Sequence, residues 1–266
     1  MADYRELLGS DEEDTLRKLD VEIHASSVSF KRKLRESDMR AVAGILISLK
    51  NRTNDDDYHI ALGDWIHQAD EWFGRDVGMH WVREEVKRNA YRDYLQMLTG
   101  ASLIQLQILE YFVHCCCSAL GLKTKNGKTL DLSDFLSSDP NHKNEMLGTL
   151  KGALEKASLF NRGFEERLAE FVEKRNRFVH DFWLKALMDP SFSNRPSFEA
   201  LARIEEFLSG LLKEAVELEA PFRGLLYSID KGMAERFNLR DDMRNGVFVE
   251  WSKYEKDFLS VANKPI

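Results

Sequence analysis

The chain has 266 residues, of which 43% are hydrophobic and 31% are charged, and it contains 15 glycines and 5 prolines. This ordinary globular balance with few turn-forming residues favours long helices and excludes a sandwich or barrel of many short strands. The net charge of −7 excludes a surface that is basic all over, of the kind that binds duplex DNA, but it is compatible with a local cationic site.

No targeting segment is expected in this sequence. Residues 1–16, MADYRELLGSDEEDTL, are acidic and lack the apolar core of a secretory signal peptide. No apolar run reaches the roughly 18 residues that a membrane span requires. The three cysteines are consecutive and give no indication of an oxidising compartment. We therefore expect a cytoplasmic protein that does not contact a membrane.

Residues 1–90 are expected to form a mainly helical region of unknown role. Within it, residues 9–14, GSDEED, are interpreted as a surface loop or a frayed start. Residues 20–34 contain enough alternation for one or two short strands. The basic cluster KRKLR at 31–35 indicates a solvated helix face, with an RNA-contacting patch as the alternative. The helices expected after it are 38–52, capped by Ser37 or Asp38, then 63–73 and 81–100.

Residues 91–221 are expected to form a bundle of four or five helices, so that the chain is all-α. A polar loop at 123–134, with a turn at Asn126 and Gly127, separates the first two helices. Residues 222–266 are expected to be a C-terminal extension packed on the bundle, with one more helix and the apolar run GVFVEW. The expected bundle helices are 101–122, 142–160, 162–188 (stopped by Asp189 and Pro190) and 197–222 (capped by Ser197 and ended by Pro221).

The cysteines Cys115, Cys116 and Cys117 lie in an apolar helical segment. We interpret them as buried thiols that act as small hydrophobic residues, with a metal-binding role beside His114 as the alternative. The other histidines have no metal-like partners at helical spacing and are expected on the surface or in the core. No P-loop, dinucleotide-binding fingerprint, HExxH or GxSxG motif is present, so neither a metal nor another cofactor is expected.

Residues 173–183, EKRNRFVHDFW, place polar side chains inside an apolar helix. At about 100° per residue, Arg175 lies near the centre of the apolar stripe and must meet a carboxylate such as Glu110, or an opening that holds an anion or water. Asn176 and His180 share the next face. The stripe consists of Phe164, Leu168, Phe171, Val172, Phe178, Val179 and Phe182.

Two interpretations of this cluster are open. In the first, it is a structural polar cluster in which Arg175 pairs with Glu110. In the second, it is a functional site for a phosphodiester, because a guanidinium binds phosphate by two hydrogen bonds and an imidazole transfers protons near neutral pH. Trp183 and Leu187 lie on the same face as Asn176 and His180, and an exposed strip of this kind indicates contact with another surface.

The run Arg175-Asn176-Arg177-Phe178-Val179-His180 resembles the R-[polar]-x-x-x-H motif of HEPN domains, and the likeness extends to the helix order over residues 90–220. The HEPN family implies a helical bundle, mostly dimeric, and in many members a metal-independent ribonuclease of toxin or antiviral systems. It also has members that only bind partners. The N-terminal 90 residues show no likeness to a family.

The resemblance implies a role for each matching position. Arg175 would bind or polarise the scissile phosphate, His180 would act as general acid or base, and Asn176 would be the polar second residue. Glu110 corresponds to the acidic residue that many members carry on an earlier helix. The neighbours Arg177 and Asp181 are given supporting roles, and Trp183 and Leu187 a place in a dimer interface.

The resulting expectation is an endoribonuclease that uses the RNA 2′-hydroxyl as its nucleophile and works as a homodimer, with an antitoxin or defence-system partner. The alternative is a non-catalytic module of the same fold that binds nucleotide, RNA or protein. The acidic net charge and the few basic residues beside the motif favour this alternative. A third interpretation is a structural helical protein in which the motif arises by chance.

Overall fold

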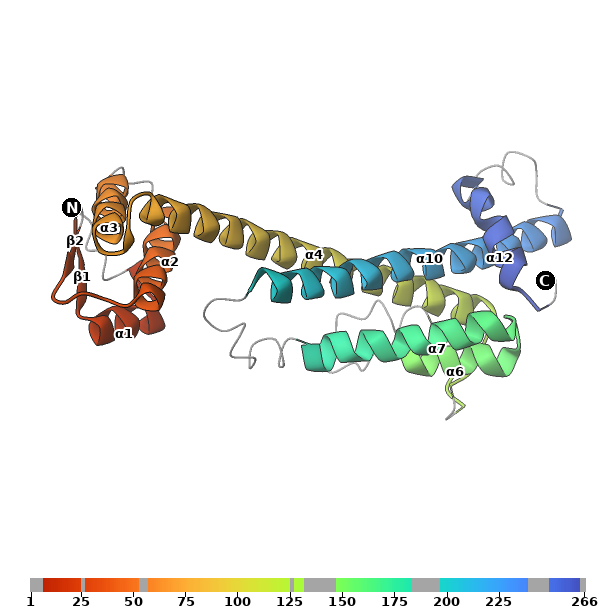
Figure 1. Cartoon of the computed structure of the whole chain (residues 1–266). Coiled ribbons are helices and arrows are strands. Elements are labelled where there is room, and N and C mark those ends of the chain that lie inside the picture. Colours follow the sequence, from red (N-terminus) through yellow and green to blue (C-terminus); the bar gives the residue numbers. More distant parts are fainter. Residues whose placement is uncertain are drawn as a thin grey trace. The chain divides into compact units, whose positions relative to one another are not determined.

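The computed structural model describes residues 7–24, 27–52, 57–124, 127–131, 147–182, 197–238 and 249–263. These residues are mainly helical and include one small two-stranded sheet (Figure 1), which confirms the expected all-α class. The chain divides into two compact units, Met1–Tyr94 and Leu95–Ile266. Each unit has its own buried residues and is described by itself.

The N-terminal unit combines helices with a β-hairpin. Its elements are α1 (Ser10–Leu19), β1 (Val21–His24), β2 (Ser27–Phe30), α2 (Glu36–Arg52), α3 (Asp57–Phe73) and the first part of α4 (Val77–Ala119). The strands pair antiparallel with Val21 opposite Phe30, so both of the short strands considered from the sequence are present. The core is mostly aliphatic and also holds the indole rings of Trp65, which is fully buried, and of Trp81, with 6.2 Å between the ring centroids.

Two local expectations for this unit are wrong. The acidic stretch at 9–14 is not a loop, because α1 begins at Ser10 with acidic side chains in its first turn, where they complement the helix dipole. The Glu12 carboxylate also accepts a hydrogen bond of 2.8 Å from the Gly9 backbone N–H. The basic cluster at 31–35 is not on a helix, since it forms the connection between β2 and α2.

Helix α4 is continuous over 43 residues, where the sequence predicted two helices that meet at Gly100. A single glycine in a helix costs about 1 kcal/mol and does not by itself end the helix. The polar neighbours are satisfied within the helix, since Thr99 and Ser102 each donate a side-chain hydrogen bond of 2.8 Å to the carbonyl four residues earlier. Among the described helices, α4 included, none is both long and apolar enough to cross a membrane.

The C-terminal unit is a helical bundle. Besides the end of α4 it contains α6 (Leu147–Ala157), α7 (Arg162–Asn176), η2 (Arg177–Phe182), α10 (Phe198–Arg236), η3 (Val249–Tyr254) and α12 (Glu255–Val261). Ser197 caps α10 as predicted, because its side chain accepts a hydrogen bond of 3.1 Å from the Ala200 backbone N–H. Asn161 caps α7 in the same way through Phe164.

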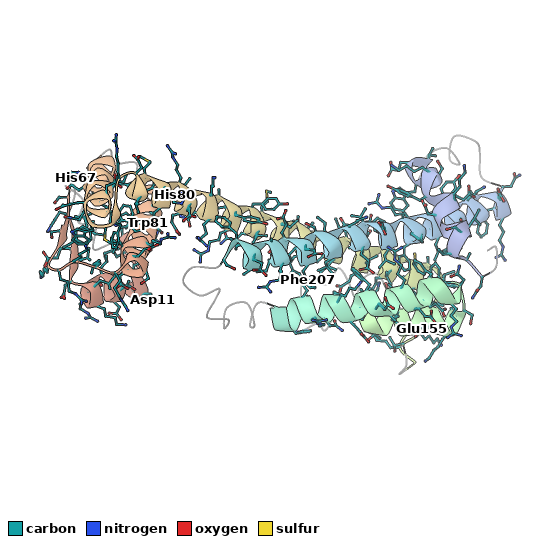
Figure 2. All side chains as sticks on the ribbon, viewed as in Figure 1. Asp11, His67, His80, Trp81, Glu155 and Phe207 are labelled. Carbon is teal, nitrogen blue, oxygen red and sulfur yellow. The ribbon has the colours of Figure 1, made fainter. Side chains whose placement is uncertain are left out.

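Helices α7 and α10 lie side by side and antiparallel (Figure 1). Arg167 pairs with Glu217, and Lys174, further along α7, pairs with Glu214, which comes earlier on α10. Further along still, the ring of Phe178 lies 6.3 Å from that of Phe207, a residue labelled on α10 in Figure 2. This pairing packs the helix that carries the polar cluster along α10, which also contacts α4 through the hydrogen bond from Cys116 to the Phe222 carbonyl.

The predicted end of the last bundle helix at Pro221 is wrong, because α10 continues to Arg236. A proline inside a helix removes one backbone hydrogen bond and costs about 3 kcal/mol or more. Here the residues just beyond it are buried: Phe222 and Leu225 are fully enclosed. Gly224 brings the same part of α10 against Tyr254 and α12. Burial of these side chains offsets the loss, so packing decides the outcome against local preference.

Candidate functional site

The apolar face of α7 is buried as the sequence predicted. Phe164, Leu168, Phe171 and Val172 are all buried. Arg175 continues the same stripe towards the end of the helix, and only 12% of its side chain is exposed. The structure therefore holds a guanidinium at a position that the helical pattern reserves for an apolar residue.

Glu110 of α4 is the partner of this guanidinium. Nη2 of Arg175 lies 2.7 Å from Oε1 of Glu110, whose side chain is 16% exposed. Nη1 of Arg175 donates a hydrogen bond of 3.1 Å to the side-chain oxygen of Asn176. The three side chains thus form one polar cluster that links α4 to α7, and the pairing of Arg175 with Glu110 considered from the sequence is present.

Burial dominates the electrostatics of the cluster. It raises the pKa of Glu110 above its ordinary value, and the attraction of Arg175 only partly opposes this effect. The Nε atom of Arg175 is buried and has no hydrogen-bond partner among the described residues. Among the described residues, the guanidinium is therefore held through Nη1 and Nη2 and not through Nε.

The polar motif continues into a π-helix. The α-helix ends at Asn176, and η2 (Arg177–Phe182) has the wider turns of a π-helix, a form that is rare and frequently found at functional sites. Phe178 is fully buried in this segment, whereas Asn176, Arg177 and His180 are exposed. The π-helix is thus anchored inwards by Phe178 and presents the imidazole of His180 to solvent.

The helical wheel of the sequence fails beyond Asn176. It placed Val179 in the buried stripe, but Val179 is 40% exposed. The cause is the change from α- to π-helical turns at Arg177, after which 100° per residue no longer applies. The side chain of Asp181, and Trp183 and Leu187 entirely, lie outside the described residues, so their predicted roles stay predictions.

Cys116 and Cys117 are buried in α4 as predicted, whereas Cys115 is partly exposed. Cys116 and Cys117 are fully enclosed and donate weak hydrogen bonds to the carbonyls of Phe222 and Leu150, at 3.4 and 3.9 Å. Burial raises the pKa of all three thiols, that of Cys117 to about 12. In the described part of the chain, no group of three or more His, Cys, Asp or Glu side chains could hold a metal ion.

The basic cluster at 31–35 does not form an unpaired cationic patch. Lys31 lies 2.7 Å from Glu22, and Lys33 donates to the Trp72 carbonyl at 3.3 Å. Arg32 and Arg35 lie near carboxylates as well, at 3.4 and 3.0 Å. Because each cation has an acceptor nearby, this structure favours the interpretation as ordinary solvated surface over an RNA-contacting patch.

Comparisons with protein-family models, with curated proteins and with solved structures found no match for this chain. The candidate site is therefore defined by its own geometry. It consists of the Arg175–Glu110 pair between two helices, Asn176 on the guanidinium, and the exposed imidazole of His180 on the π-helix that follows.

Proposed function

We propose that the chain is a metal-independent endoribonuclease of the HEPN type, acting in a toxin or antiviral defence system. The observation that supports the proposal is the orientation of Arg175. Its guanidinium is held by Glu110 and Asn176, and a potential proton-transfer group, His180, is exposed five residues further along the chain, on the π-helix that follows. A cation fixed in advance stabilises developing negative charge better than a mobile one, because it does not need to reorganise during the reaction.

The reaction assigned to these groups is transesterification of RNA. The 2′-hydroxyl oxygen attacks the neighbouring phosphorus and loses its proton to a base, the bond from phosphorus to the 5′-oxygen breaks, and this oxygen takes up a proton. The products carry a 2′,3′-cyclic phosphate and a 5′-hydroxyl. In this proposal Arg175 stabilises the phosphate and His180 transfers one of the two protons.

Glu110 is proposed to act through Arg175 and not on the substrate itself. It neutralises the guanidinium in part, so a bound phosphate would share the cation with the carboxylate. A second motif from another copy of the chain would add positive charge at the same phosphate. We therefore include a homodimer with a composite site in the proposal, and Trp183 and Leu187 as candidates for its interface.

The direct test incubates the purified protein with total RNA in the presence of EDTA. We expect cleavage to continue without divalent ions and to leave cyclic phosphate ends. Arg175→Ala and His180→Ala should each lose about 10²–10⁴-fold in rate. The control is Arg162→Ala, which removes a cation that pairs with exposed Glu166 at the other end of α7. Wild-type protein that cleaves no RNA, or variants that cleave as fast as wild type, would overturn the proposal.

A non-catalytic binding module is the second candidate. Two observations favour it: the Arg175 charge is already compensated by Glu110, and the chain as a whole is acidic. Expression in a bacterial host separates the two candidates in a cell. If the chain is an unregulated ribonuclease, cells that express the wild type should grow more slowly than cells that express His180→Ala. If it is a binding module, the two strains should grow equally.

A further inference from the structure

One of the lysine and arginine side chains on α7 and η2 lacks the carboxylate partner that the others have among the described residues. Five lysine or arginine residues occur over residues 162–182, and four of them have a carboxylate partner. Arg162 pairs with Glu166 at 2.7 Å, Lys174 with Glu214 at 2.8 Å, Arg175 with Glu110 at 2.7 Å, and Arg167 with Glu217. The fifth, Arg177, is exposed and has no ion-pair or hydrogen-bond partner for its side chain among the described residues.

Arg177 also occupies a distinctive place. It is the first residue of the π-helix, directly after Asn176 and three residues before His180, and all three side chains are exposed. It directly follows Asn176, whose side-chain oxygen accepts a hydrogen bond from the guanidinium of Arg175. An RNA strand bound at Arg175 and Asn176 would therefore pass close to Arg177 as well.

The acidic residues of α7 restrict where a polyanion can lie. Glu166, Glu170 and Glu173 are exposed on the part of the helix before the motif. The charges of Glu170 and Glu173 repel a phosphate backbone, whereas Glu166 and most of the cations nearby are neutralised by ion pairs. The end of the helix, where Arg177 has no ion-pair partner among the described residues, is the place on this helix where a bound phosphate is attracted most strongly.

We propose that Arg177 binds the RNA phosphate next to the scissile one and so holds the strand across the motif. The inference rests on the proposed function, since it names the substrate contact of the same site. Arg177 has no ion pair with another described residue that it would lose on binding a phosphate, and its guanidinium can form two hydrogen bonds to the phosphate. Arg177 is accordingly a substrate-binding residue with no part in proton transfer.

The test measures binding instead of cleavage. Affinity for a fluorescent single-stranded RNA is titrated at several salt concentrations, with His180→Ala as the parent so that the RNA stays intact. Adding Arg177→Gln should weaken binding about tenfold at low salt. It should also reduce the slope of log affinity against log salt by about 0.7, the value for one phosphate contact on a single strand. Adding Arg177→Lys in its place should keep most of the slope.

The control is Arg162→Gln in the same parent, which makes the same change in net charge at the far end of α7. Its slope should equal that of the parent. An unchanged slope with Arg177→Gln, an equal loss with Arg162→Gln, or a parent that binds no RNA would each overturn the inference. If the binding results are as expected but wild type cleaves no RNA, then the proposed ribonuclease activity fails while Arg177 as a phosphate contact is supported.

Discussion

Arg175 and Glu110 meet at 2.7 Å although they belong to different helices, and both side chains are less than one-fifth exposed. The pair differs in kind from the exposed Arg162–Glu166 pair of the same helix, which solvent screens. Burial raises the pKa of Glu110, and Arg175 is the group that opposes this shift. The charged state of the carboxylate therefore depends on the arginine.

The first prediction concerns the pH dependence of stability in Arg175→Met. Without the guanidinium, the carboxylate is buried without a counter-charge, and at about pH 8 the free energy of unfolding should fall by about 3 kcal/mol. The pKa of Glu110 in the folded protein is then raised further above its value in the unfolded chain. A group with a raised pKa favours the folded state at low pH and loses this contribution as the pH rises, so the loss should shrink towards about pH 5.

Urea unfolding of Arg175→Met and wild type at the two pH values measures this difference. The double variant Arg175→Met with Glu110→Gln is the control, since it has no carboxylate to titrate and should lose the extra pH dependence. If Arg175→Met lost the same free energy of unfolding at both pH values, the contribution of Arg175 to stability would not come from its ion pair with Glu110.

The second prediction concerns the close approach of α10 to the C-terminal segment. A Cβ atom on Gly224 would lie 2.1 Å from the backbone oxygen of Tyr254 and 2.8 Å from Cβ of Phe258. Gly224→Ala must therefore push η3 and α12 away from α10, and we expect the free energy of unfolding to fall by about 3 kcal/mol. Thermal and urea unfolding of the full chain measure the change.

Gly232 provides the matched control on the same helix, because a Cβ atom there meets nothing within 4 Å. Gly232→Ala should stabilise the protein by about 0.5–1 kcal/mol through the better helix propensity of alanine. A fall in the free energy of unfolding for Gly224→Ala together with a rise for Gly232→Ala would support the close packing of α12 on α10. A stabilising Gly224→Ala would contradict it.

The sequence was sufficient where local chemistry and periodicity decide the structure. The buried stripe of α7 from Phe164 to Val172, the Ser197 cap and the need of Arg175 for a carboxylate partner all followed from spacing and from the cost of burying a charge. Glu110 could be named because it lies on another apolar helix, but nothing local fixed its distance from Arg175.

The sequence was insufficient where tertiary packing overrides local preference. Gly100 and Pro221 are typical helix-ending residues, yet α4 and α10 continue through them because buried residues on both sides stabilise the helices. The π-helix at Arg177 was also not predicted, since the hydrophobic spacing over 164–178 fits an ordinary α-helix. Its consequence was a wrong placement of Val179.

The third prediction tests the continuity of α4 at Gly100. A Cβ atom at this position meets nothing within 4 Å, and the residue is within the helix. Gly100→Ala should therefore stabilise the protein by about 1 kcal/mol, whereas Gly100→Pro should destabilise it by about 3 kcal/mol or more. Circular dichroism and urea unfolding measure both effects. If Gly100→Ala destabilised the protein, two helices with a turn at Gly100 would describe the chain better.

The last prediction concerns the three adjacent thiols. A cysteine attacks a disulfide reagent as its thiolate. Burial raises the pKa of Cys115, of Cys117 (to about 12) and, most strongly, of Cys116. At neutral pH almost no thiolate is present at Cys116 or Cys117, and neither side chain is accessible. Cys115 is partly exposed, so it alone should react in the native protein. Its reaction should be slow at neutral pH and should become faster as the pH rises.

A disulfide reagent that releases a coloured thiol counts the reactive groups with time. We expect one slow group in native wild type, none in native Cys115→Ser, and two more groups than the native count when either protein is unfolded in urea. Rapid reaction of native Cys115→Ser would show that α4 opens at Cys116 and Cys117, and would contradict the tight packing of these thiols against Phe222 and Leu150.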